Sequence, residues 1–170
     1  MIEDHSLSKK HKIVSYSIAI SLLLLGFYIV ALKFVHTDLS RIPGDMGDAR
    51  FNNYILEHGY QFLTGEIRTY WDASFMFPYK NVIALSDNLL GTVPIYSLFR
   101  IIGVDRETSF QFWLLTLFVL NYICCFWALK KWSGDIILSA VGAYIFAFGI
   151  YNHGQIFHVQ VFPRFITPLL

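Results

Sequence analysis

The sequence predicts an all-α membrane protein, with polytopic transmembrane helices and a long external loop that carries amphipathic juxtamembrane helices. Composition is the first observation: 55% of the 170 residues are hydrophobic and only 15% are charged, whereas an ordinary soluble domain carries about 25% charged residues. The second is that Asp, Glu, Lys and Arg are absent from three long stretches of the chain. The third is the segment 36–107, which is rich in aromatic side chains of the kind that settle at headgroup depth.

The charge balance excludes a nucleic-acid partner. The chain has 13 basic and 12 acidic residues and a net charge of +1, whereas binding to phosphates needs a concentrated positive field. The only cysteines, Cys124 and Cys125, are neighbours in a predicted helix, where they point in different directions and form no structural disulfide. The sequence contains no CxxC, HExxH or glycine-rich phosphate loop. The partner that the composition indicates is the lipid bilayer.

Residues 1–12 are predicted to be a cytoplasmic N-terminus, and residues 13–35 the first transmembrane helix. The run from Ile13 to Leu32 lacks Asp, Glu, Lys and Arg, and at about 1.5 Å per residue it crosses the roughly 30 Å hydrocarbon layer. A basic start before an apolar core also occurs in secretory signals. No small-x-small cleavage pattern follows the run, which favours an uncleaved anchor.

The other charge-free stretches predict further spans. Residues 108–129 form the second transmembrane helix and residues 136–152 the third, with a cytoplasmic turn at 130–135 between them. Residues 153–163 are then a second external loop. The apolar run at 164–170 predicts the start of another helix, so we expect the sequence to be the N-terminal piece of a longer polytopic protein.

A short apolar run at residues 88–99 decides the topology. About 12 residues are too few for a comfortable crossing, so we expect a juxtamembrane helix at about 87–102. Both lysine clusters, within residues 9–12 and at 130–131, then face the cytoplasm, as the positive-inside rule favours. If the short run crossed instead, the second cluster would lie outside. The preferred topology is a multi-pass protein of the cell inner (plasma) membrane with a cytoplasmic N-terminus.

The segment that precedes this short run has two interpretations. Ser86 or Asp87 before apolar residues is typical of a helix start. An open helix N-terminus near the membrane is also an anion site, where a phosphate of a lipid carrier could bind. Asp87 itself would oppose such an anion.

The external loop, residues 36–107, also predicts a helix at about 46–63, because apolar side chains recur there at helical spacing. The apolar stripe consists of Phe51, Tyr54, Ile55, His58 and Phe62. A helix of this kind lies on the membrane. Asp48 and Asn52 fall at the edge of the stripe, with Asp45 close by. Glu57 falls on the wetter side.

The two aspartates have a structural and a chemical interpretation. Asp48 precedes or opens the helix, where an Asp commonly serves as the N-cap. Asp45 has less claim to that role. Alternatively, a carboxylate that is partly desolvated at this depth has a raised pKa and acts as a general base on a hydroxyl brought to the membrane surface. The two roles can coexist in the pair.

Several segments resemble the N-terminal module of bacterial GT-C type membrane glycosyltransferases. The segments are PGDMGDARFNNYILEH after the anchor helix, WDASFMFPYKNVIALSDNLLGTVPIYSLFRIIGVDRETSFQFW, a helix closed by LKKW, and GAYIFAFGIYNHGQIFHVQVFPRF. The layout is similar to that of protein O-mannosyltransferases and of the aminoarabinose transferases of lipid A. The resemblance implies an essential acid in the first external loop, juxtamembrane helices in that loop, and polar ligands from the second external loop.

The resemblance assigns the first-loop catalytic acid to Asp45 or Asp48, between which the sequence does not choose. The candidate substrate-binding residues are Asn52, His153, Gln155, His158, Gln160 and Arg164. The second external loop of many relatives supplies another acid, but YNHGQIFHVQVFPRF has none, which counts against a two-acid metal site. A divalent metal that neutralises the leaving phosphate stays an open alternative.

The second-loop residues also have plain structural interpretations. His153 and His158 are five positions apart, about 140° around a helix, and would not share a face to bind zinc. They are otherwise polar residues of a helix end near the headgroups. Arg164 matches phosphate geometry, but it could equally extend its guanidinium to the interface.

The resemblance implies transfer of a sugar from a polyprenyl phosphate donor to an acceptor hydroxyl on the outer face, with inversion at the anomeric carbon. Asp45 or Asp48 would take the proton of the hydroxyl while polyprenyl phosphate leaves. The alternative is a non-catalytic membrane subunit, or a lipid or polysaccharide transporter component, whose acids are helix caps. Intramembrane charges would favour transport, but only Lys33 lies near a span, at the end of the helix.

Overall fold

The computed structural model describes residues 2–35, 47–156 and 158–170. In these ranges the regular elements are helical, which confirms the predicted all-α class. The α-helices are α1 (Ile2–Val35), α2 (Asp48–Leu63), α3 (Val93–Ile101), α4 (Arg106–Ser133), α5 (Ile136–Phe148) and α6 (Ile150–Gly154). The 3-10 turns are η1 (Ser74–Met76), η2 (Val82–Leu85), η3 (Leu90–Thr92), η4 (Val159–Val161) and η5 (Thr167–Leu169).

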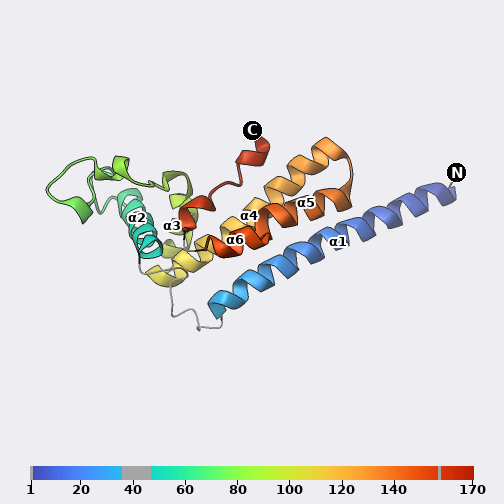
Figure 1. Ribbon diagram of the computed structural model, residues 1–170, viewed down its shortest axis with the longest axis horizontal. Helices are drawn as coiled ribbons and strands as arrows, with labels where there is room; N and C mark the ends of the chain where they lie inside the picture. The colour runs from blue at the N-terminus through green and yellow to red at the C-terminus, as the bar shows by residue number, and fades with distance from the viewer. Residues whose placement is uncertain (1, 36–46, 157) are drawn as a thin grey trace.

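The long helices form a bundle, and the short ones gather at one of its ends. Helices α1, α4 and α5 pack side by side, while α2, α3 and the segment between them lie at the end away from the N-terminus (Figure 1). The turn between α4 and α5 lies at the same end as the N-terminus. The polar chemistry of the first loop is therefore concentrated at one end of the bundle.

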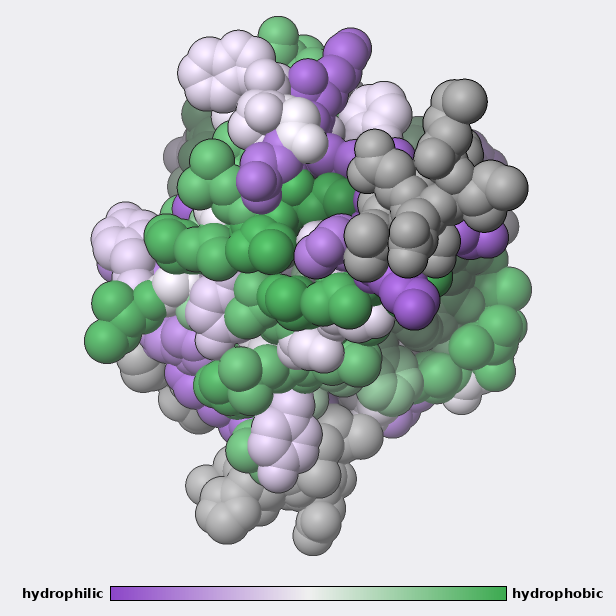
Figure 2. All heavy atoms as spheres, turned by 90° about the vertical axis from the view of Figure 1, so that its right-hand side faces the viewer, coloured by the Kyte–Doolittle hydropathy of each residue, from purple (hydrophilic) through white to green (hydrophobic). Residues whose placement is uncertain are grey.

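In the part of the chain that the structure describes, three helices are long and apolar enough to cross a membrane, as predicted. They cover Lys9–Lys33, Arg106–Ser133 and Ile136–Gly154. Many of their apolar side chains, such as those of Leu24 and Ile145, are exposed on the bundle. The end-on view in Figure 2 likewise shows apolar side chains over much of the surface. In a membrane protein such side chains contact lipid, so three lipid-facing spans account for this surface.

The spans approach one another closely where small residues face large ones. A Cβ at Gly26 of α1 would lie 2.3 Å from a ring carbon of Phe148 in α5. The hydroxyl of Tyr122 in α4 donates a 2.7 Å hydrogen bond to the Ala19 carbonyl of α1. Close packing at small residues and interhelical hydrogen bonds are the usual means of association inside lipid.

Both lysine clusters lie at the same end of the bundle, as expected if the short apolar run does not cross. The ammonium group of Lys130 lies 4.9 Å from the centroid of the Tyr16 ring on α1 and donates to its hydroxyl. The short run forms α3, whose 9 residues extend only about 14 Å at 1.5 Å per residue. It exposes Leu98, Ile101 and Ile102, the kind of surface that a helix at the bilayer boundary would bury.

The third span is broken at Gly149, which the sequence analysis did not predict. A Cβ at this position would lie 2.5 Å from the Ile145 carbonyl oxygen. The side chain of Asn152 in α6 donates to the carbonyls of Phe146 at 2.7 Å and Ala147 at 2.9 Å. These carbonyls have lost their helical partners, and the amide replaces them.

One predicted helix boundary differs from the structure. Ser86 and Asp87 do not start the helix, because the chain first makes the 3-10 turn η3 at Leu90–Thr92 and becomes α-helical only at Val93. Residues 164–170 contain the 3-10 turn η5, and the start of a further helix there stays a prediction. The expected helix at 46–63 begins at Asp48 in the part of the chain that the structure describes.

The apolar stripe of α2 is covered by the chain itself instead of by lipid. Ile55 is fully buried with Tyr70, Ala73, Val82 and Ile83, and the rings of the stripe pack around this cluster. His58 is also buried and pairs through Nε2 with the Tyr70 carbonyl at 2.8 Å. The prediction that this stripe lies on the membrane is therefore wrong, because the aromatic segment after α2 folds back over it.

Candidate functional site

A polar pocket lies beside the first turn of α2. Its volume is about 570 Å³, and it is lined by Asp48, Phe51, Asn52, Ala84, Leu85, Ser86, Asp87 and Gln160. These residues come from α2, from η2 and the segment after it, and from η4. The pocket thus joins the first predicted external loop to the second.

Asp48, which lines the pocket, contacts two residues of the second loop. Nδ1 of His158 lies 2.8 Å from the Oδ2 atom of Asp48. The side-chain amide of Gln160 donates to the same oxygen at 3.3 Å. The structure therefore brings a candidate catalytic acid, Asp48, together with two candidate substrate-binding residues that lie 110 and 112 positions after it in the sequence.

Asn52 lies one turn further along α2 and hydrogen-bonds to both Asp48 and Gln160. Its Nδ2 donates to the Asp48 carbonyl at 2.8 Å and to Gln160 Oε1 at 3.2 Å. The residue is only 2% exposed, and its Oδ1 atom is buried without a hydrogen-bond partner. Gln160 is thus held at both ends of its amide, by Asn52 and by Asp48.

The local sequence of the second loop explains why these side chains reach Asp48. Val159 and Phe162 are fully buried, and the Phe162 ring lies 4.7 Å from that of Phe118 on α4. The side chain of Asn121, in the middle of α4, donates a 3.0 Å hydrogen bond to the Phe162 carbonyl. Val159 and Phe162 thus anchor η4 to the bundle, and the side chains of His158 and Gln160 face α2.

Helix α2 is held from its other face by an ion pair with α3. Arg100 contacts Glu57 through Nε at 2.9 Å and Nη2 at 3.1 Å, and the Tyr96 hydroxyl donates to Glu57 at 2.6 Å. Hydrogen bonding to Glu57 raises the pKa of the Arg100 guanidinium further. The Glu57 side chain is only 12% exposed. The prediction that Glu57 lies on a wetter face is therefore wrong, because its partner comes from another helix.

The electrostatics of Asp48 also differ from the prediction of a raised pKa. The hydrogen bonds from His158 and then from Gln160 lower the pKa of its carboxyl, more than partial desolvation raises it. The Asp48 side chain is 46% exposed and that of His158 is 54% exposed. At neutral pH the carboxyl is therefore ionised and accessible to a ligand.

Asp48 is not the N-cap of α2. The N-cap is Gly47, and Asp48 is the first helical residue. Its negative charge still lies in the first turn, where it complements the helix dipole, but its side chain bonds to the second loop. Asp45, the other candidate acid, lies outside the described residues.

The remaining candidates of the second loop do not line the pocket. His153 belongs to α6, and Gln155 is the first residue after the end of this helix. The Nη2 group of Arg164 donates to the Phe146 carbonyl at 2.9 Å and to Asn152, and its guanidinium lies 4.8 Å from the Phe146 ring centroid. Arg164 thus stabilises the break between α5 and α6. Whether its remaining N–H groups bind phosphate stays a prediction.

Three residues at or near the pocket were not among the candidate site residues. Ser86 and Asp87 line the pocket, whereas their pattern left open a helix start or an anion site. Asn121 holds Phe162, two residues after Gln160, against α4. An amide in a charge-free span is a signal that could have found Asn121, because polar side chains inside lipid generally face a partner.

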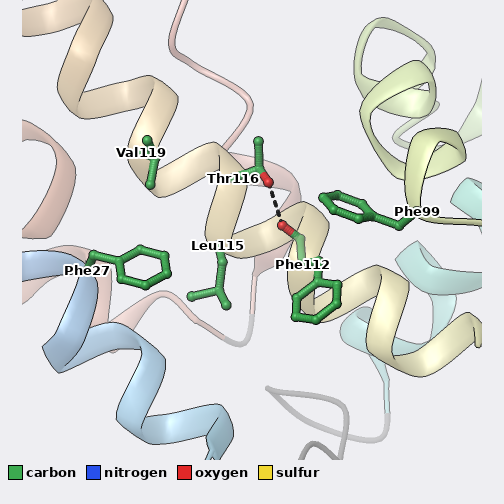
Figure 3. Close-up of a pocket in the computed structure, with 6 residues that line it drawn as sticks. All are labelled: Phe27, Phe99, Phe112, Leu115, Thr116 and Val119. Carbon is green, nitrogen blue, oxygen red and sulfur yellow. Dashed lines mark hydrogen bonds between the residues drawn. The ribbon is translucent and has the colours of Figure 1, made fainter. Parts of the chain in front are cut away.

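A second cavity is apolar and lies in the bundle. It has a volume of about 360 Å³ and is lined by Phe27, Phe99, Phe112, Leu115, Thr116 and Val119. Figure 3 shows these side chains arriving from α1, α3 and α4. The only hydroxyl among them, on Thr116, donates to the Phe112 carbonyl at 2.7 Å. This cavity offers contacts to aliphatic groups only, so the polar chemistry belongs to the pocket at Asp48.

The polar pocket can bind hydroxyl groups and accept a proton. Asp48 and Asp87 supply carboxylates, and Asn52 and Gln160 supply amides. Within the described ranges no three His, Cys, Asp or Glu side chains cluster as metal ligands.

In comparisons with protein-family models, curated proteins and solved structures, the chain has no match.

Proposed function

We propose that the chain is part of a GT-C type membrane glycosyltransferase, which moves a sugar from a polyprenyl phosphate donor to an acceptor hydroxyl on the outer face of the membrane. The observation that carries the proposal is the 2.8 Å contact between Asp48 of the first loop and His158 of the second. It places an ionised, accessible carboxylate in a polar pocket at one end of a bundle of three apolar helices.

The chemistry of the pocket suits inverting transfer. The acceptor oxygen forms a bond to the anomeric carbon of the sugar, the bond from that carbon to the phosphate oxygen breaks, and its electron pair leaves with polyprenyl phosphate. The proton of the acceptor hydroxyl passes to a base in the pocket. Carboxylate and amide side chains such as Asp87 and Asn52 are suitable partners for the hydroxyl groups of a sugar.

The orientation of the bundle is part of the proposal. The N-terminal part of α1 and the turn between α4 and α5 lie at the end opposite α2 and α3 (Figure 1). These segments carry the lysine clusters, and the positive-inside rule assigns such an end to the cytoplasm. The pocket would then face the outside of the inner (plasma) membrane. A lipid-linked donor can reach it there without leaving the bilayer, because only its sugar and phosphate have to enter the polar pocket.

The test uses the full-length protein in liposomes. Polyprenyl phosphates that carry radiolabelled hexoses, pentoses or aminosugars are supplied together with acceptor membranes, and release of polyprenyl phosphate and transfer of label are measured. We expect one donor class to turn over, and Asp48→Asn to reduce the rate by about 10²-fold or more, the scale of a lost acid or base.

The matched control is Glu66→Gln, which removes an exposed carboxylate of the same loop outside the pocket and should leave the rate unchanged. Turnover of none of the donors would overturn the proposal in favour of a lipid-handling or non-catalytic membrane subunit. Equal rates for the wild type and Asp48→Asn would also overturn it, because the pocket would then not be the reaction site.

A further inference from the structure

We propose that His158 takes the proton of the acceptor hydroxyl and that Asp48 positions its imidazole ring. This inference rests on the proposed function and deepens it, because it assigns the base to a residue of the second loop. Asp48 then becomes a positioning residue. The argument starts from which atoms of the pair are already engaged.

The contact determines which nitrogen of His158 is basic. An ionised carboxylate only accepts hydrogen bonds, so Nδ1 of His158, at 2.8 Å from Asp48 Oδ2, must donate. A neutral ring with its proton on Nδ1 carries its lone pair on Nε2. The hydrogen bonds that lower the pKa of Asp48 keep the carboxylate in its accepting form. The basic atom of the pair is therefore Nε2 of His158.

The surroundings hold the ring while leaving it accessible. Val159, the next residue, is fully buried, and Gln160 donates to the same Oδ2 atom of Asp48 at 3.3 Å. The His158 side chain nevertheless remains 54% exposed. Asp48 Oδ2 is already engaged by two donors, whereas no protein group is hydrogen-bonded to Nε2 in the described part of the chain.

The charged side chains of the pocket beside the pair are carboxylates. Asp48 comes from α2, and Asp87, from the segment before η3, lines the same pocket. Gln160 on η4 and Asn52 on α2 are neutral. No Lys or Arg is among the described residues that line the pocket. The Asp48 carboxylate, in contact with the ring, stabilises the imidazolium that forms when Nε2 accepts a proton.

The reaction step balances without a further reactant. The acceptor oxygen bonds to the anomeric carbon as its proton moves to Nε2 of His158. The electron pair of the breaking bond leaves on the polyprenyl phosphate oxygen. The imidazolium is then held beside Asp48 until it releases its proton to water.

The pH dependence of the rate distinguishes the two candidate bases. An imidazole ordinarily titrates near pH 6.5 and an aspartic acid near about 3.9. If His158 is the base, the transfer rate of the full-length protein in liposomes should already fall at a pH well above the range in which carboxyl groups titrate. If Asp48 is the base, the rate should hold to about pH 5, and this result would overturn the inference.

Variants separate catalysis from structure. His158→Ala should lose about 10²-fold or more in rate, and added imidazole should restore part of it, because the missing base is replaced in the pocket. Asp48→Asn should lose a similar factor with no rescue by imidazole, and the double variant should be no slower than either single one. His11→Gln, which replaces an exposed histidine near the N-terminal end of α1, is the control and should keep the wild-type rate.

A measurement that needs no substrate completes the test. In the full-length protein labelled with 15N-histidine, the His158 signals, identified by their loss in His158→Gln, should show the proton on Nδ1 at pH 8. Asp48→Asn should shift the ring toward the other tautomer. A wild-type ring with its proton on Nε2 overturns the inference. So does full activity of His158→Ala beside an inactive Asp48→Asn, a result that keeps the proposed function with Asp48 as its base. Failure of the wild type to turn over any donor, by contrast, rejects the proposed function itself.

Discussion

At the scale of single residues, Asp48 is defined by its partners more than by its place in a helix. Its position at the start of α2 suggested either a cap or a base with a raised pKa. In the structure it is not the cap, and its pKa is lowered instead of raised, because His158 and Gln160 hydrogen-bond to its carboxylate. Helical periodicity identifies the edge of a stripe, but it carries no information about a partner 110 positions away.

The first prediction concerns the titration of Asp48. A depressed pKa in the folded protein means that the carboxylate contacts stabilise the fold above the unfolded pKa of about 3.9 and lose that effect as the pH falls through the folded value. The contact between α2 and η4 should therefore persist from pH 7 to pH 5. A 13C titration of the Asp48 carboxyl should give a midpoint below that of a free Asp, and His158→Gln should raise it. A wild-type midpoint at or above the free value contradicts the prediction.

At the scale of elements, the position of α2 depends on contacts from three sides. The aromatic segment covers its apolar stripe, the second loop contacts its first turn, and α3 holds Glu57. In addition, a Cβ at Gly59 would lie 2.5 Å from a Val93 methyl carbon, so α2 and α3 are in close contact. A helical wheel shows how side chains are distributed around one helix and carries no information about neighbouring helices. It therefore predicted wrongly that Glu57 lies on a solvent-exposed face.

The second prediction tests the ion pair between α2 and α3. Glu57→Gln leaves Arg100 half-buried without its counter-charge and should destabilise the protein by about 2 kcal/mol, less than the 3–5 kcal/mol of a fully buried pair. Thermal unfolding in detergent measures the change. Glu66→Gln, at an exposed position in the turn after α2, should leave the unfolding temperature unaltered. Equal unfolding temperatures for all three proteins would contradict the role of the pair.

The third prediction tests the break in the third span. Asn152→Leu removes the amide that pairs with the carbonyls of Phe146 and Ala147. Arg164 still donates to the Phe146 carbonyl, but the buried Ala147 carbonyl loses its donor, and a buried carbonyl without a partner costs about 1–3 kcal/mol. The variant should therefore unfold at a lower temperature in detergent. Tyr151→Phe, at an exposed neighbouring position, is the control and should match the wild type. A stable Asn152→Leu protein would mean that the break needs no side-chain partner.

At the scale of the whole molecule, the parts that are local in sequence were predictable. A membrane span is a property of one continuous stretch, so charge-free runs identified all three candidate spans. The short run that forms α3 was identified by length alone. The pocket was predictable only in its residue types, because Asp48, Ser86 and Gln160 meet through tertiary packing. The break at Gly149 escaped notice because the mean hydropathy of that stretch stays high across it.

The fourth prediction concerns the orientation of the bundle. Glu107 and Lys131 are exposed near opposite ends of α4, about 36 Å apart at 1.5 Å per residue. In a background without Cys124 and Cys125, a single cysteine at position 107 should react with an impermeant thiol reagent added to intact cells. One at position 131 should react only after the cells are opened. The reverse pattern would place the pocket on the cytoplasmic side.

The hydrogen bond from Asn121 to Phe162 limits how the protein can be dissected. An excised first loop would retain Asp48 and Asn52, but it would lack both His158 and Gln160. It would also lack Asn121 of α4, which holds the segment with His158 and Gln160 against the bundle. A grafted loop or a soluble fragment would therefore carry half of a site with nothing to align it. The smallest transplantable unit is the loop pair together with the membrane helix that supports it.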